Sequence, residues 1–244
     1  MKLTEHIYQV SGNSFGTNSS NYILDAGSEL ILFDAGYSDY QLKVMERTMQ
    51  YWGIGEKPIT HGFLTHVHMD HAANAAAFQE KGAGIYIGEK DADTLEHGGP
   101  EALEVLFGRK FQTCRADVRL KDAEEFVFGK ITVKCIALPG HTPGSMGFLV
   151  DDGGIKCLIT GDFIAVSAVE PDESDQQVLL SAMIRPGFME EAYGESLQKA
   201  SGLTADILLP GHLLPYFGNP AGLFRKAYHK FVTEKHDILD TTKL

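Results

Sequence analysis

Hydrophobic and polar residues alternate in short runs near the start of the chain and predict strands followed by a helix. Apolar positions recur within His6–Val10, Ser20–Asp25 and Glu29–Asp34, and Gly, Asn and Ser residues that favour turns separate these runs. Ser38 and Gln41 then form a capping-box pattern, after which apolar residues recur at helical spacing. We therefore expect an antiparallel meander and a surface helix with one buried stripe.

Strand and helix patterns alternate in the next segment and predict a βαβ unit. Ile59–Leu64 and Gly84–Gly88 are short apolar runs, and Ala72–Lys81 between them is rich in alanine. In Glu89–Arg115 the helical pattern is interrupted by glycine and proline, so we expect short helices and loops there.

The second half of the chain begins with a further set of short apolar runs. Two mixed sheets with helices outside them are the natural packing for this order of elements, so the fold class is predicted as α/β (α+β). The length of 244 residues fits one domain over residues 1–244. The expected strands are Glu125–Phe128, Ile131–Leu138, Met146–Val150, Ile155–Thr160 and Ile207–Leu209, and the expected helices are Glu190–Ser201 and Pro220–Thr233.

The composition is that of a folded, acidic protein. Hydrophobic residues make up 43% of the chain and 26 residues are glycine, which is enough for a sizeable core and many tight turns. The formal net charge of −12 provides no basic surface for nucleic acid or for an anionic membrane. Neither is expected as a partner.

The cysteines and the N-terminus favour a cytoplasmic protein. Cys114, Cys135 and Cys157 form no CxxC pair, and their odd number provides no self-contained disulfide framework. Residues 1–6 are polar and lack the apolar run of a secretory signal, and no later stretch is long and apolar enough to span a membrane. We expect a reducing, cytoplasmic location.

Histidine and aspartate residues follow four of the predicted strands. The densest group is the string His-x-His-x-Asp-His over residues 66–71, directly after a strand that ends at Leu64. His141 stands in a Pro-Gly-His-Thr-Pro-Gly stretch, Asp162 in Thr-Gly-Asp and His212 in Leu-Leu-Pro-Gly-His, each after an apolar strand. Open α/β sheets place ligands at the carboxyl ends of strands, so these positions predict a site.

The spacing of these residues suits two metal ions. In an extended chain residues two apart share one face, so His66 and His68 can bind one cation, while Asp70 and His71, at the turn into the helix, face a second. Three nitrogen ligands leave a position open for water on a catalytic zinc. The full predicted set is His66, His68 and His141 for one ion, Asp70, His71 and His212 for the other, and Asp162 as the bridge between them.

These residues, in this order along the chain, resemble the motifs of the metallo-β-lactamase fold superfamily. The resemblance covers nearly the whole chain and implies a four-layer αββα sandwich of two mixed β-sheets with outer helices and a dinuclear site at the sheet edges. Asp34-Ala35-Gly36 is similar to the early Asp-x-Gly turn of that superfamily. Asp34 is therefore expected to orient a ligand rather than to bind metal itself.

Within the superfamily, the resemblance favours a hydrolase of thioesters or lactones. The combination of Asp162 and His71 is similar to glyoxalase II and to the acyl-homoserine lactonases, whereas true metallo-β-lactamases lack the bridging aspartate and are exported. The chain lacks the Gly-Cys-Gly-Arg stretch that follows this aspartate in glyoxalase II, and Ala165 stands where the lactonases have a tyrosine. The resemblance therefore leaves the substrate open.

The favoured mechanism is hydrolysis of an ester, thioester or lactone carbonyl of a small acyl substrate by a hydroxide that bridges two divalent metal ions. Asp70 is the candidate general acid/base as well as a ligand. Zinc is the default metal, and iron and manganese remain open because imidazole and carboxylate ligands suit all three.

Two other reaction classes share this scaffold. One is a mono-iron oxidoreductase of the persulfide dioxygenase type, which uses His66, His68 or His141, and Asp162. The other is a phosphodiesterase or nuclease, which the net charge of −12 disfavours.

Substrate choice is expected to depend on the segments after Asp162 and around His212. Apolar and charged side chains near these segments are candidates to line a mostly apolar pocket, although such residues more often serve packing. They are Tyr193, Tyr216, Phe217, Met183 and Arg185.

Overall fold

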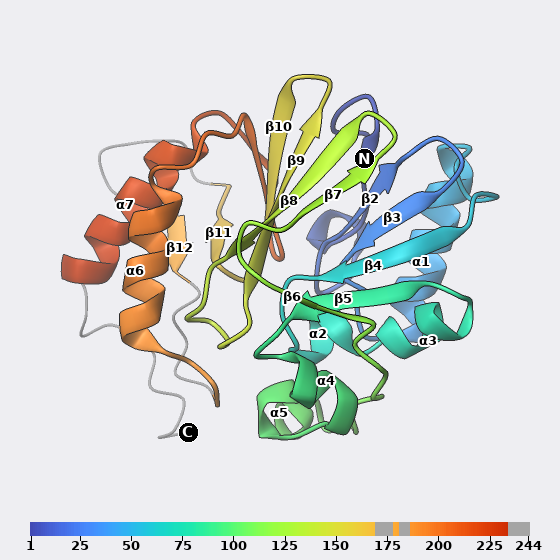
Figure 1. Cartoon of the computed structure of the whole chain (residues 1–244), viewed down its shortest axis with the longest axis horizontal. Coiled ribbons are helices and arrows are strands. Elements are labelled where there is room, and N and C mark those ends of the chain that lie inside the picture. The colour runs from blue at the N-terminus through green and yellow to red at the C-terminus, as the bar shows by residue number, and fades with distance from the viewer. Residues whose placement is uncertain (169–177, 181–185, 234–244) are drawn as a thin grey trace.

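The computed structural model describes residues 1–168, 178–180 and 186–233. Two six-stranded β-sheets face each other, and helices cover their outer faces (Figure 1). This is the αββα sandwich that the sequence predicted.

The first sheet contains the strands of the first half of the chain in sequential order. Its first three strands are antiparallel and the remaining pairings are parallel. The predicted meander and βαβ unit are confirmed, and only the last strand was not predicted. The strands are β1 (Ile7–Ser11), β2 (Asn21–Asp25), β3 (Leu30–Phe33), β4 (Ile59–Leu64), β5 (Gly84–Gly88) and β6 (Val118–Leu120).

The first long helix is α1 (Asp39–Tyr51), and Ser38 caps it as predicted by accepting a hydrogen bond from the backbone N–H of Gln41 over 3.2 Å. The reciprocal half of the capping box is missing. The Gln41 side chain is buried and donates to the carbonyl oxygen of Ser19 and to Oδ1 of Asn21. It therefore fixes the loop between β1 and β2.

The helix predicted to start at Ala72 begins earlier, at Met69, and is broken into α2 (Met69–Ala72) and α3 (Ala75–Glu80). Asp70 and His71 were expected in the turn before the helix, and they lie inside its first turn instead. The prediction relied on the alanine-rich pattern, which marks only the later part of the helical segment. An acidic residue in a first helical turn is electrostatically favourable.

The second sheet has the order β14-β13-β10-β9-β8-β7 and is antiparallel except for the pairing of β10 with β13. A separate pair of short strands follows β10. Neither these two strands nor β14 was predicted. The strands are β7 (Glu125–Phe128), β8 (Ile131–Ala137), β9 (Met146–Asp152), β10 (Ile155–Gly161), β11 (Ile164–Val166), β12 (Val178–Leu180), β13 (Ile207–Pro210) and β14 (Tyr216–Phe217).

The remaining helices are short except for two that cover the second sheet (Figure 1). In the part of the chain that the structure describes, none of the helices has the length and apolar character that crossing a bilayer requires. The helices are η1 (Asn13–Phe15), α4 (Ala92–His97), η2 (Pro100–Ala102), α5 (Glu104–Phe107), α6 (Glu190–Ala200) and α7 (Pro220–Thr233). Three of the short helices, α4, η2 and α5, lie between β5 and β6, as predicted for Glu89–Arg115, whereas η1 lies between β1 and β2.

The core between the sheets is built on aromatic rings from both of them. The ring of Phe148, on β9, lies 5.6 Å from that of Phe33 and 5.4 Å from that of Phe63, which belong to the first sheet. All three side chains are fully buried. Because this contact fixes one sheet against the other, it also fixes the relative positions of the loops at their shared edge.

Candidate metal centre

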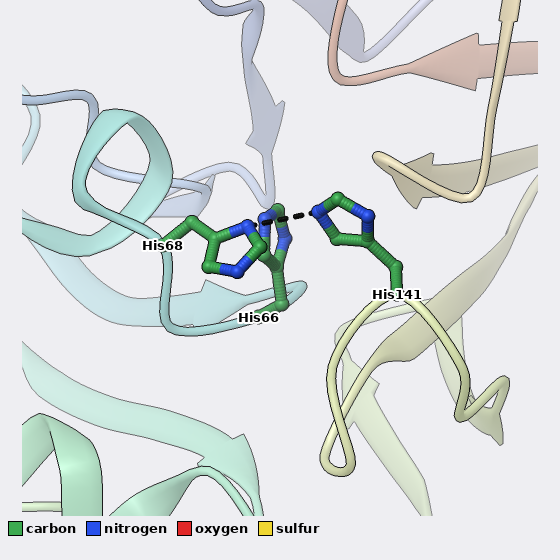
Figure 2. Close-up of side chains that lie close together, drawn as sticks. All are labelled: His66, His68 and His141. Atoms are coloured by element: carbon green, nitrogen blue, oxygen red, sulfur yellow. Dashed lines mark hydrogen bonds between the residues drawn. The ribbon is translucent and has the colours of Figure 1, made fainter. Parts of the chain in front are cut away.

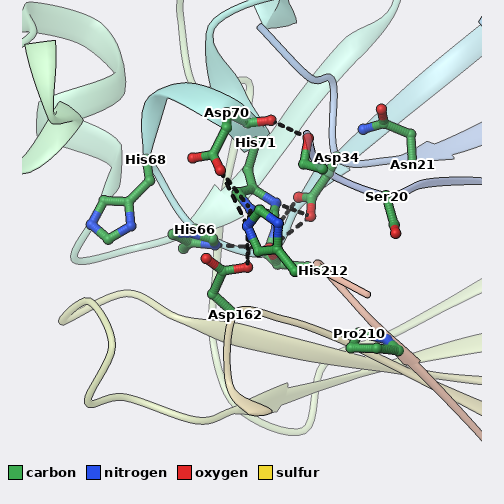
Figure 3. A network of polar contacts seen from close by, with 12 residues as sticks. Ser20, Asn21, Asp34, His66, His68, Asp70, His71, Asp162, Pro210 and His212 are labelled. Carbon is green, nitrogen blue, oxygen red and sulfur yellow. Dashed lines mark hydrogen bonds and ion pairs between the residues drawn. The ribbon is translucent and has the colours of Figure 1, made fainter. Parts of the chain in front are cut away.

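Seven histidine and aspartate side chains gather where loops of the two sheets meet. The loop after β4 and the helix α2 supply four of them, and the segments that follow β8, β10 and β13 supply one each (Figure 2 for His141, Figure 3 for the other six). The parallel pairing of β10 with β13 brings the last two segments side by side. The structure therefore brings together every ligand candidate predicted from the sequence: His66, His68, Asp70, His71, His141, Asp162 and His212.

The first cluster consists of His66, His68 and His141 (Figure 2). Nδ1 of His68 lies 2.8 Å from Nε2 of His141, and all three residues offer nitrogens within 4.8 Å of one another. Nε2 of His66 is buried and has no hydrogen-bond partner among the described residues. A buried nitrogen left in this way is costly unless it has a partner, so the donor set fits a cation held by three imidazoles.

The second cluster consists of Asp70, His71, Asp162 and His212. Nε2 of His212 lies 3.2 Å from Oδ2 of Asp70 and 3.2 Å from Oδ1 of Asp162. Nε2 of His71 lies 3.0 Å from the same Asp162 oxygen. Two carboxylates and two imidazoles facing one point form a donor set for a divalent cation of the zinc, iron or manganese type.

Asp162 lies between the two clusters. Its Oδ1 faces His71 and His212, while its Oδ2 lies 3.6 Å from Nε2 of His141 in the first cluster. Its two oxygens thus point toward different clusters, which is the arrangement that a bridging carboxylate requires.

The electrostatic environment of the first cluster favours neutral histidines. Burial, together with the neighbouring His71, His68 and His141, holds the pKa of His66 well below its usual range. Burial and His141 have the same effect on the pKa of His68. Neutral imidazole is the form that coordinates a cation.

The second cluster has the opposite environment. Burial alone would lower the pKa of His71, but Asp162, Asp70 and Asp34 raise it well above its usual range. Burial likewise opposes the charged form of His212, yet Asp162 and Asp70 raise the pKa of this residue to about 10. The carboxylates therefore favour the protonated form of these histidines, and a divalent cation would take the place of those protons.

Asp34 stabilises the second cluster through hydrogen bonds to His71 and to Thr65. Its Oδ2 accepts hydrogen bonds from Nδ1 of His71 over 2.8 Å and from Oγ1 of Thr65 over 2.9 Å, and its Oδ1 accepts one from the Thr65 backbone over 2.7 Å. Its backbone lies in the left-handed region, with a φ of 59°. The bond to Nδ1 turns Nε2 of His71 toward the other ligands, the orienting role expected from the sequence.

Asp91 supports the first cluster in a comparable way and was missed by the sequence analysis. Its carboxylate accepts hydrogen bonds from the backbone of Val67 over 3.1 Å, from Oγ1 of Thr142 over 2.6 Å and from the backbone of Gly144 over 2.7 Å. Burial raises the pKa of Asp91 to about 6 although these hydrogen bonds lower it. One signal was available, because Asp91 closely follows β5, a parallel strand that ends near the same edge.

Asn18 is a second residue that the sequence did not reveal. Its side-chain amide donates to Oδ2 of Asp70 over 3.0 Å, and its backbone carbonyl accepts from Nδ1 of His212 over 3.0 Å. It lies in the loop between β1 and β2, where Asn residues are ordinary turn formers. Sequence pattern alone therefore gives it no special status.

A cavity of about 530 Å³ opens onto both clusters and is lined by His68, Asp70, His141, Asp162 and His212. The remaining lining is mainly apolar, as expected, but it comes from other residues than those suggested. Tyr193, on α6, is fully buried in the core that α6 and α7 help to form, and neither Tyr216 nor Phe217 is among the described lining residues. Met183 and Arg185 lie outside the described residues.

An αββα sandwich with two adjacent ligand clusters at one sheet edge defines a class of metalloprotein. Residues 15–212 match the family model of the metallo-beta-lactamase superfamily. The chain belongs to this superfamily. Solved structures agree on the fold: a metallo-beta-lactamase family protein from Thermus thermophilus superposes with a TM-score of 0.73 at 18% identity, covering 96% of this chain and 82% of that one. The FEZ-1 metallo-beta-lactamase from Legionella gormanii gives 0.74 at 17% identity, covering 96% and 94%.

Sequence relatives are hydrolases by name. A hydroxyacylglutathione hydrolase of Brucella anthropi is 34% identical over 100 residues, covering 41% of this chain and 31% of that protein. One from Anaeromyxobacter dehalogenans is 31% identical over 148 residues, covering 61% and 47%. A probable metallo-hydrolase of Bacillus subtilis is 24% identical over 168 residues, covering 66% and 75%. The chain thus spans less than half the length of the first two relatives.

Proposed function

We propose that this chain is a metal-dependent hydrolase that holds two divalent cations and cleaves an ester, thioester or lactone bond. The observation that carries the proposal is the pair of clusters that share Asp162 and open into one cavity. The superfamily and the names of the hydroxyacylglutathione hydrolases support the same reaction class.

The proposed ligands are His66, His68 and His141 for one cation and Asp70, His71 and His212 for the other, with Asp162 facing both. Bound there, divalent cations lower the pKa of a coordinated water and polarise a carbonyl oxygen. Asp34 and Asp91 hold the protein side of the centre in place, through His71 and through the loops around Val67 and Thr142.

Asp70 is the proposed general acid/base. The residue is 6% exposed and lines the cavity, so its carboxylate can reach a bound substrate. Burial would raise the pKa of Asp70, but His71 and His212 lower it, so the carboxylate is in its ionised form, which has a free position for a proton from the attacking water. The protonated Asp70 carboxyl group then gives this proton to the leaving group.

Zinc is the proposed metal, with the mono-iron oxidoreductase as the competing reaction. An oxygenase with a single iron would need only the first cluster and Asp162. The cluster of Asp70, His71 and His212 would then have no metal to bind, so its presence favours the two-metal hydrolase. A small uncharged or weakly charged acyl substrate is the proposed partner. The net charge of −12 argues against nucleic acid, and a cytoplasmic location remains a proposal from composition.

The test starts from protein purified without added metal, whose metal content and oxygen uptake are measured first. The two-zinc form is then assayed against thioesters, lactones, a phosphodiester and a cephalosporin, with His68→Ala as the inactive control. Two zincs per chain, no oxygen uptake and turnover of a carbonyl substrate are the expected results. One iron with oxygen consumption, or turnover of the phosphodiester alone, would overturn the proposal.

A further inference from the structure

The cavity above the two clusters has one polar floor and apolar walls. Among the described residues, its polar lining consists of the five cluster residues already named and Asn18. Every other described lining residue is leucine, phenylalanine or alanine. At about 530 Å³ the cavity falls in the range of pockets that enclose drug-sized ligands, so it has room for more than a two- or three-carbon acid.

Two separate parts of the chain build most of the apolar walls, and Leu213, after β13, adds to them. Leu103, Leu106 and Phe107 come from the short helical segment around α5, and Leu179 and Leu180 come from β12. The two strands β11 and β12 pair with each other beside the centre, and Ala165 on β11 completes this wall without a side chain that could hydrogen-bond. Apolar surface therefore faces the substrate from both sides.

Leu103, in the wall around α5, has a strained backbone conformation. Its φ of 62° lies in the left-handed region, which a bulky side chain occupies only at a cost. The Leu103 side chain is nevertheless buried, and Phe107 packs against the ring of Tyr37 with centroids 5.3 Å apart. Local strain of this kind is retained where the surrounding structure requires it.

Two of the wall residues are unusually exposed for leucine. Leu106 is 61% exposed and Leu179 is 41% exposed, and they belong to opposite walls. Isolated exposed leucines are common, but two that line the same cavity from opposite walls both offer apolar surface that a ligand between them would cover. Val105, next to Leu106, is 93% exposed and is not a lining residue.

The described walls of the cavity carry no charged side chain, and the ionisable residues lie on its polar floor. Asp70 and Asp162 line it, and no lysine or arginine is among the described lining residues. The carboxylates of a glutathione conjugate would therefore find no cationic partner on the described part of these walls, and burying them unpaired is costly. A neutral alkyl or aryl chain meets no such penalty.

We propose that the substrate of this centre carries a medium-length, uncharged apolar acyl group, which lies between the α5 wall and the β12 wall while its carbonyl faces the two clusters. This inference rests on the proposed hydrolase function and narrows it. It separates the chain from its hydroxyacylglutathione hydrolase relatives in substrate class. Leu106 is a specificity-determining residue in this arrangement.

The test compares three 4-nitrophenyl esters on the two-zinc protein: the acetate, the octanoate and the mono-ester of octanedioic acid, which adds a terminal carboxylate at equal chain length. We expect kcat/KM for the octanoate to exceed that for the acetate by at least about tenfold, because the extra methylenes are buried. The ω-carboxylate should cost about tenfold or more. A hydroxyacylglutathione thioester should be a poorer substrate than the octanoate.

Leu106→Lys and Val105→Lys form a matched pair of variants. Both place the same charge on adjacent exposed positions of α5, but only Leu106 lines the cavity. We expect Leu106→Lys to lower the ratio of octanoate to ω-carboxylate turnover at least about fivefold, and Val105→Lys to leave the ratio as in the wild type. Equal ratios in the two variants would overturn the role of Leu106.

A binding measurement separates this inference from the proposed function. Calorimetry with free octanoate and octanedioate on the zinc-loaded protein should show tighter binding of octanoate. If carbonyl substrates are hydrolysed without a chain-length gain, the hydrolase stands and the apolar-acyl inference is wrong. If no carbonyl substrate is turned over but octanoate binds selectively, the hydrolase is wrong and the apolar site stands, and failure of both measurements overturns both.

Discussion

The carboxylate of Asp91 accepts a hydrogen bond from Oγ1 of Thr142 over 2.6 Å, and this contact joins the loop after β5 to the loop that carries His141. The same carboxylate accepts from the backbone of Val67, which stands between His66 and His68. One buried side chain therefore links the two loops that carry the three histidines of the first cluster. It does so without being a ligand itself.

The ionisation of Asp91 should make a measurable contribution to stability. Burial raises its pKa from 3.8 to about 6, so the folded state holds this proton more tightly than the unfolded state does. Its contribution to the free energy of unfolding must therefore fall as pH rises from about 4 to about 6, and level off above. Between pH 5 and pH 7.5 the expected loss is about 1 kcal/mol.

Asp91→Asn tests this dependence because it removes the titration and keeps the volume. Guanidinium unfolding of the metal-free wild type and variant at both pH values gives the difference in their free energies of unfolding. The wild-type advantage should be smaller at pH 7.5 than at pH 5. An advantage that grows with pH would contradict the sign argued here.

Asn18→Ala should weaken the second cation position. The change removes the amide that donates to Oδ2 of Asp70 and leaves the backbone carbonyl that accepts from His212. Loss of such a support typically lowers metal affinity by about 10- to 100-fold, and we expect the lower end for one exposed donor. Competition titration with a chromophoric chelator measures the affinity of each cation position in the wild type and in the variant. Ser14→Ala, at an exposed position of the same loop, is the control, and an equal loss at both positions would argue against the assignment.

Asp70→Asn should separate proton transfer from metal binding. Asparagine keeps one oxygen that faces His212 but cannot hold the transferred proton, so kcat should fall by about 100-fold or more while both cations remain bound. Metal content, kcat and the acidic limb of the pH profile are the measurements. Unchanged turnover with full metal content would remove the proton-transfer role and leave Asp70 as a ligand only.

Gly211→Ala should disturb the second cluster through steric contact. A Cβ atom at this position would lie 2.5 Å from Oδ1 of Asp162 and 2.6 Å from Cε1 of His71. Both proposed ligands must shift, so we expect a loss of about 1–3 kcal/mol in stability and weaker binding of the second cation. Gly202→Ala is the matched control, since its nearest neighbour is 3.5 Å away. Thermal unfolding with and without zinc compares the two variants, and equal melting temperatures would refute the clash.

Much of the architecture follows from local pattern. The strands β5 and β7 begin and end where the sequence predicted, because Gly residues and alternating apolar positions mark their limits. The ligand candidates were found because each follows a strand, and strand ends meet at a sheet edge. The helix start at Met69 was missed because His-x-His-x-Asp-His has no helical periodicity of its own.

Other features depend on contacts between distant segments and have no local signature. β11 and β12 are only three residues each and are defined by pairing with each other. Asp91 gains its role from Val67 and Thr142, which are 24 and 51 positions away. Asn18 acts on a residue 52 positions later. Such relationships become visible only once the sheets are assembled.

Each cluster draws its side chains from both sheets. His66 and His68 belong to the first half of the chain and His141 to the second, and Asp70 with His71 faces Asp162 with His212 in the same way. Metal ions bound there would cross-link the two halves of the polypeptide. Neither half could then melt without releasing them, so loading would couple the two halves into one cooperative unit and protect both from local opening.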